Sequence, residues 1–168
     1  MERMMTPQLD RLDRRITRWM AHNSLLILRV CLGIVFFWFG FLKFFPGLSP
    51  AQELATRTIE VLSFGLVKPA LSLPLLAGWE SLIGLGLILG GREGWVMRAT
   101  LLLLFLQMLG TLTPLFLFPG EVFTRVPYAP TLEGQYIIKN IVLVAAGLVI
   151  GATVRGGYLI ADPKERGR

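Results

Sequence analysis

Four long apolar stretches constrain the fold of this chain more than any other feature of its sequence. They cover about residues 24–45, 69–90, 95–118 and 135–154. Because about 20 apolar residues suffice for a helix to cross the hydrocarbon core of a bilayer, each stretch predicts a transmembrane helix. The composition agrees, since 54% of the 168 residues are hydrophobic and 17% are charged. The sequence therefore predicts an all-α membrane protein, a bundle of four transmembrane helices, and excludes a water-soluble enzyme.

The first 23 residues carry a different pattern from the apolar stretches that follow. Five arginines fall in this segment, and its apolar side chains recur at helical spacing, namely Leu9, Leu12, Ile16, Trp19 and Met20. A helix with one basic and one apolar face is typical of segments that lie in the membrane interface. We therefore expect a basic amphipathic interfacial helix (1–23), a four-helix transmembrane domain (24–155) and a short cytoplasmic tail (156–168).

Lysine and arginine residues are unevenly distributed between the two sides of the expected bundle. Eleven of the 17 lie in the two tails or near the connection between the second and third spans, three lie on the opposite side, and three lie inside spans. The positive-inside rule then places both termini in the cytoplasm. Because membrane orientation explains the net charge of +6, we expect a lipid bilayer and no nucleic acid as the partner of these residues.

The connection from residue 46 to 68 is long for a simple turn and carries helix signals of its own. Ser49 is the expected N-cap, Pro50 falls in the first turn, and Gln52 follows three residues after the cap. An apolar stripe accompanies them: Ala51, Leu54, Ala55, Ile59 and Leu62. We expect a short helix that lies on the outer face of the bundle or dips into it. The other outer connection, 119–134, is expected to cover the same mouth.

Glu80 is the residue that most directly suggests a site. Counting 1.5 Å per residue, it lies about 15 Å from either end of its span, near the membrane midplane. A charged carboxylate at that depth costs about 2.5–3.5 kcal/mol on insertion scales, so it needs a cation, a proton or water. Two interpretations follow: a functional site, or a structural ion pair that fixes the register of the helices.

Three basic residues inside the spans are candidate partners for Glu80. Lys139 lies about 7 Å below the outer edge of its span and Lys43 about 3 Å below, and their long side chains can extend inward. Arg29 approaches from the cytoplasmic half. Depth alone ranks Lys139 first and leaves Lys43 and Arg29 as alternatives.

Other polar residues inside the spans extend the candidate site. Gln107 lies near the depth of Glu80, and Thr111 and Pro114 follow on the same helix face, where the proline predicts a kink. Asn140 adds an amide in the fourth span, and polar atoms at such depth need partners. These residues predict a polar cavity in the centre and outer half of the bundle. The ligand-binding or proton-relay candidates are Glu80, Lys139, Lys43, Arg29, Gln107 and Asn140.

Small residues indicate where helices approach one another. Arg29, Gly33, Phe36, Gly40 and Lys43 are spaced by four, three, four and three residues, so they share one narrow stripe of the first span. Glycine lets a neighbouring backbone come close. We expect helix-packing contacts at Gly33, Gly40, Gly84, Gly147 and Gly151.

The metal-binding and redox residues of this chain are few. It has one cysteine, Cys31, and one histidine, His22. These cannot supply a zinc site, an iron–sulfur cluster or a cysteine-pair redox centre, so we expect no metal. Any redox chemistry then needs a bound organic molecule or a partner protein.

Several of these motifs resemble those of a known family. The stripe from Arg29 to Lys43 resembles the R-x3-G-x2-F-x3-G-x2-K pattern that opens DoxX-like membrane proteins. Glu80 with Gly84 and Gly86 is similar to the E-x3-G element of their second helix, and LEGQYIIKN resembles the start of the last helix in that superfamily, including its YkgB-like branch. The resemblance covers about residues 24–155. It implies a four-helix inner-membrane protein of bacteria, with some relatives acting as membrane subunits of thiosulfate:quinone oxidoreductase and others associated with oxidative stress.

Three functional hypotheses follow. The first is a quinone-like small-ligand-binding membrane subunit, without a metal or thiol centre, that works with a redox partner protein; Glu80 and Lys139 then orient the ligand's polar head or relay protons. The second is a small transporter or permeation protein whose buried charges mark the path of a proton or polar solute, with a homo-oligomer enclosing the route. The third is a structural scaffold in which every buried charge is paired.

Overall fold

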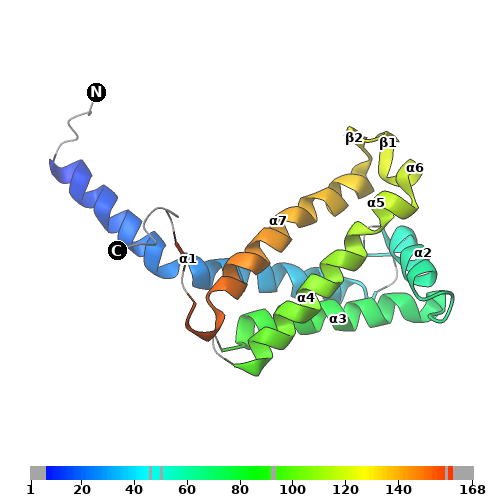
Figure 1. Cartoon of the computed structure of the whole chain (residues 1–168), viewed down its shortest axis with the longest axis horizontal. Coiled ribbons are helices and arrows are strands. Elements are labelled where there is room, and N and C mark those ends of the chain that lie inside the picture. The colour runs from blue at the N-terminus through cyan, green and yellow to red at the C-terminus, as the bar shows by residue number, and fades with distance from the viewer. Residues whose placement is uncertain (1–6, 46, 50, 92–93, 158, 161–168) are drawn as a thin grey trace.

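The computed structural model describes residues 7–45, 47–49, 51–91, 94–157 and 159–160. In this part of the chain, four helices are long and apolar enough to cross a membrane, which confirms the predicted all-α, four-span architecture. They are α1 (Pro7–Leu42), α3 (Pro69–Leu89), α4 (Trp95–Leu112) extended by α5 (Pro114–Leu117), and α7 (Leu132–Ala152). Figure 1 shows these helices as the long elements of the bundle.

Short elements complete the structure at the connections. They are α2 (Gln52–Leu62), α6 (Pro119–Val122), the antiparallel strands β1 (Phe123–Arg125) and β2 (Ala129–Pro130), and the 3₁₀ turn η1 (Val154–Gly156). The two-stranded ribbon was not predicted. The kink expected at Pro114 is confirmed, because α4 ends at Leu112 and α5 begins at the proline, whose ring fits the first turn of a helix.

Helix α1 runs without interruption from Pro7 to Leu42, so the basic segment and the first span form one helix. Its first half extends beyond the other helices (Figure 1). The helix therefore does not break at the boundary expected after residue 23. The location of residues 7–23 in the membrane interface stays a prediction. Residues 1–6, and most of the expected tail after residue 157, lie outside the described residues.

Helices α1 and α3 are antiparallel and pack backbone to backbone through glycines. A Cβ atom at Gly33 would lie 2.9 Å from the carbonyl oxygen of Gly84, and one at Gly40 would lie 2.8 Å from the backbone nitrogen of Ser81. A Cβ at Gly84 would overlap the backbone nitrogen of Phe37. Side chains at these positions would force the two helices apart. The glycines therefore fix the register in which α1 meets α3.

That register leaves half of α3 to be covered by another element. Gly40 contacts Glu80, and α1 ends two residues later, whereas α3 begins at Pro69, about 16 Å from Glu80 along the helix axis. Helix α2 fills this space and contacts both α3 and α5. The predicted short helix is thus confirmed, although its expected N-cap was wrong.

The start of α2 differs from the expected capping arrangement. The N-cap is Ala51, whose left-handed backbone (φ 55°) turns the chain into the helix, and no side chain caps it. Ser49 lies two residues too early for this role, because the turn at Ala51 delays the first helical residue to Gln52. Pro50 is outside the described residues.

Two clusters of buried apolar side chains hold the bundle together. The larger one joins α1, α3, α4 and α7 through residues that include Phe36, Ile83, Leu104 and Ile150. The smaller one joins α2, α6 and α7 through Leu54, Val122 and Ile137. Connection 119–134 therefore packs against α2, as expected for a segment that covers the same end of the bundle.

The glycine contact predicts a position-specific effect of an added methyl group on stability. Gly84→Ala should lower the free energy of unfolding by about 1–3 kcal/mol, because its Cβ meets the α1 backbone, which cannot yield as a side chain can. The matched control is Gly78→Ala on the same helix, where a Cβ meets nothing within 4 Å. The control should be neutral or stabilising by about 0.5–1 kcal/mol, since alanine favours the helix. Equal effects in denaturant unfolding of the detergent-solubilised protein would contradict the proposed contact.

Candidate functional site

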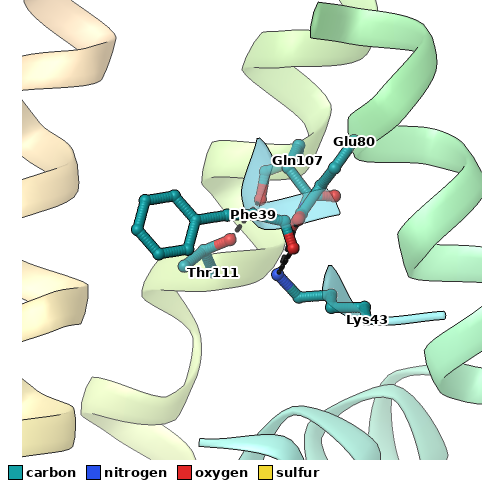
Figure 2. A network of polar contacts seen from close by, with 5 residues as sticks. All are labelled: Phe39, Lys43, Glu80, Gln107 and Thr111. Atoms are coloured by element: carbon teal, nitrogen blue, oxygen red, sulfur yellow. Dashed lines mark hydrogen bonds and ion pairs between the residues drawn. The ribbon is translucent and has the colours of Figure 1, made fainter. Parts of the chain in front are cut away.

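A buried ion pair lies where α1 ends against the middle of α3. Lys43 Nζ donates to Glu80 Oε2 at 2.6 Å, and the two side chains are 13% and 11% exposed. Lys43 also donates to the carbonyl oxygen of Phe39 at 3.3 Å, within its own chain segment. Figure 2 shows Lys43 and Glu80 pointing toward one another. The carboxylate is thus compensated by a cation inside the bundle.

Gln107 of α4 supplies the second partner of the carboxylate. Its Nε2 donates to Glu80 Oε1 at 3.0 Å, so one carboxylate oxygen accepts from Lys43, just after α1, and the other from Gln107 of α4 (Figure 2). One turn earlier in α4, the carbonyl oxygen of Leu103 accepts from Trp79 Nε1 at 3.1 Å. Trp79 immediately precedes Glu80, so this bond holds α3 and α4 at the height where Gln107 reaches the carboxylate.

The prediction that Lys139 pairs with Glu80 was wrong. Lys139 is exposed on α7, and the pairing cation is Lys43. Depth counting assumed that each span is centred on the same midplane. The glycine contact instead sets Gly40 beside Glu80, which brings Lys43 to the height of the carboxylate. The other alternative, Arg29, lies at the opposite end of α3 and donates to the carbonyl oxygen of Gly90 at 2.9 Å.

A cavity of about 320 Å³ opens beside the ion pair. Lys43, Glu80 and Gln107 form its polar end, while α2 contributes mainly apolar side chains, among them Leu54, Ala55, Ile59 and Leu62. Helix α7 contributes Glu133, Tyr136 and Asn140. A mainly apolar cavity that includes these polar residues therefore lies at the end of the bundle that α2 covers.

The structure brings together four of the six predicted site residues, namely Glu80, Lys43, Gln107 and Asn140. Asn140 lines the cavity and, among the described residues, its amide has no hydrogen-bond partner. Sequence reasoning missed Tyr136 and Glu133. Their spacing to Asn140, four and seven residues, places all three on one face of α7, and that periodicity is the signal that identifies them.

The fold and this site define a multi-pass membrane protein with a charged cluster at a cavity inside its helix bundle. Comparison with family models shows which family this is: the DoxX model matches residues 24–119, more than half of the chain, and the protein belongs to the DoxX family. The match includes Lys43, Glu80 and Gln107 and ends before α7. Comparisons with curated proteins and with solved structures found no match.

The ion pair predicts unequal effects for three lysine or arginine replacements. Lys43→Met should lower the free energy of unfolding by about 3–5 kcal/mol, because it leaves the Glu80 carboxylate buried without its cation. Lys139→Met should change it by about 0.5 kcal/mol or less, as for other exposed positions. Arg57→Met, which breaks the exposed pair with Glu121, should cost about 1 kcal/mol at most.

Denaturant unfolding of the detergent-solubilised variants measures these differences. A large effect of Lys139→Met, together with a small effect of Lys43→Met, would assign the pairing cation to α7 and contradict the geometry described above.

Proposed function

We propose that this protein is a membrane subunit that binds a small amphipathic ligand of the quinone class in the cavity beneath α2 and works with a redox partner protein. The observation that carries the proposal is the cavity of about 320 Å³ with hydrogen-bond donors at one end and apolar walls along α2. Ligand pockets typically combine mainly apolar walls with a few placed polar groups. This volume is at the small end of their range and favours a compact ring.

The donors at the polar end fit a head group that carries carbonyl oxygens. The Lys43 ammonium has three N–H bonds, of which Glu80 and the Phe39 carbonyl use two. The Gln107 amide uses one of its two N–H bonds for Glu80. The Asn140 amide uses neither of its N–H bonds within the described residues. Donors therefore remain on three different helices or helix ends around one cavity.

Each residue then has a separate role. Lys43 and Gln107 hold and orient the carbonyl oxygens of the head, while Glu80 keeps both donors in place by accepting from each of them. Helix α2 places apolar side chains beside the cavity, which lowers the local dielectric constant and strengthens the polar contacts there. A quinone, when bound, carries electrons and protons that these side chains do not themselves supply.

A structural scaffold is the second candidate, because both oxygens of Glu80 are already satisfied by protein donors. This role accounts for the ion pair. It does not account for the cavity beside the ion pair. It also does not account for the Asn140 amide, which makes no hydrogen bond within the described residues. A test that leaves the ion pair untouched separates the two functions.

Filling the cavity from α2 provides this test. Ala55→Trp places a ring among the lining residues, whereas the control Val61→Trp adds the same ring at an exposed position of α2 outside the lining. Titration of the solubilised protein with decylubiquinone, followed by calorimetry, should give binding for the parent chain and the control and at least about tenfold weaker binding for Ala55→Trp.

Two outcomes oppose the proposal. If the parent chain does not bind the quinone, the ligand class is wrong. If Ala55→Trp binds as tightly as the control, the quinone does not occupy this cavity. A scaffold predicts no binding by any of the three proteins.

A further inference from the structure

The basic residue at the other end of the stripe on α1, Arg29, has no role in the cavity beneath α2. Its Nη1 donates at 2.9 Å to the carbonyl oxygen of Gly90, which is the C-cap of α3. Gly90 is ten residues beyond Glu80, a separation of about 15 Å along the helix axis. Arg29 therefore lies at the far end of α3, where the span ends.

The guanidinium of Arg29 is incompletely paired. Its buried Nε has no hydrogen-bond partner within the described residues. The bond from Nη1 leaves the opposite edge, Nε with Nη2, without an acceptor there. Protein atoms enclose Nε, whereas the N–H bonds of Nη2 are free to bind an oxygen of a phosphate or carboxylate. A guanidinium N–H makes its strongest hydrogen bonds to anionic oxygens, so Nη2 favours an anionic acceptor.

A second cavity, of about 500 Å³, lies beside this guanidinium. The described residues that line it include no aspartate or glutamate, and none of them accepts a hydrogen bond from Nε or Nη2. Apolar side chains from α1, α4 and α7 make much of its wall, among them Leu25, Leu26, Met97 and Ile150. The cavity thus combines the guanidinium of Arg29 with an apolar surface suited to a hydrocarbon chain.

The surroundings of this cavity also favour an anionic membrane component. Helix α1 continues past Arg29 toward its N-terminus and there carries four exposed arginines: Arg11, Arg14, Arg15 and Arg18. Basic clusters next to a span attract anionic lipids. The end of a transmembrane helix is also the depth of the lipid head groups.

We propose that the cavity at Arg29 binds an anionic phospholipid, with a phosphate oxygen on Nη2 of Arg29 and an acyl chain along Leu25 and Leu26. The site is independent of the quinone-class ligand, because it involves different residues at the other end of α3. It gives the arginine of the α1 stripe a binding role of its own.

Native mass spectrometry of the full chain, released from detergent and titrated with dioleoyl phosphatidylglycerol, tests the proposal. Arg29→Gln should weaken binding of the first lipid by about tenfold or more, as expected for the loss of charge-assisted hydrogen bonds. The matched control Arg98→Gln removes an exposed arginine at the same end of the bundle that does not line the cavity, and binding should be unchanged. Leu26→Trp, which fills the apolar part and retains Arg29, should also weaken binding.

Two further titrations define the ligand. Dioleoyl phosphatidylcholine has the same phosphate and chains but a neutral head overall, and should bind more weakly than phosphatidylglycerol. Inorganic phosphate should not displace the lipid, because it lacks the acyl chain. Unchanged phosphatidylglycerol binding in both Arg29→Gln and Leu26→Trp would overturn the proposal. Equal losses in Arg29→Gln and Arg98→Gln would also overturn it, and displacement by inorganic phosphate would assign the site to free anions instead.

Discussion

The ion pair between Lys43 and Glu80 is the interaction on which the rest of this structure depends. A carboxylate in the middle of a membrane-spanning helix is costly unless it is paired, protonated or hydrated, and here a cation from another element compensates it. Lys43 reaches Glu80 only because Gly40 lets α1 approach the α3 backbone. The same contact places the end of α1 halfway along α3. The resulting space is occupied by α2 and the cavity beneath it.

The stripe on α1 thus meets α3 at its middle and at its C-terminal end. Its lysine lies at the cavity that α2 covers, and its arginine lies at the cavity beside Gly90. The glycines between them are the close contacts that hold the two helices in register. One sequence motif therefore combines a packing surface with two separately placed cations. The stripe therefore does more than pack two helices together. Its lysine pairs with Glu80, and its arginine donates to the carbonyl oxygen of Gly90.

Much of the fold could be predicted from the sequence, because hydrophobic length and proline position act locally. The four spans, the short helix after the first span and the break at Pro114 follow from such signals. The continuity of α1 could also have been predicted, since no glycine or proline lies between Pro7 and Gly33. The β1–β2 ribbon could not be predicted in this way, because two strands of three and two residues are too short to leave a recognisable sequence pattern.

The site was predictable in part. The need of Glu80 for a partner follows from its depth, and Gln107 follows from a matching depth in the next span. The identity of the cation did not follow, because it depends on how far α1 is displaced along α3, a quantity set by close contacts at Gly33, Gly40 and Gly84. Counting residues from the end of each span contains no information about that displacement.

A charge exchange between Lys43 and Glu80 tests the central claim most directly. The measurement is the thermal unfolding midpoint of the solubilised protein with Lys43→Glu, with Glu80→Lys, and with both changes. The ion pair predicts that each single reversal lowers the midpoint and that the double reversal recovers most of the loss, because opposite charges again face one another. A double variant no more stable than the worse single variant would contradict the account. So would recovery when Glu80→Lys is combined with Lys139→Glu instead.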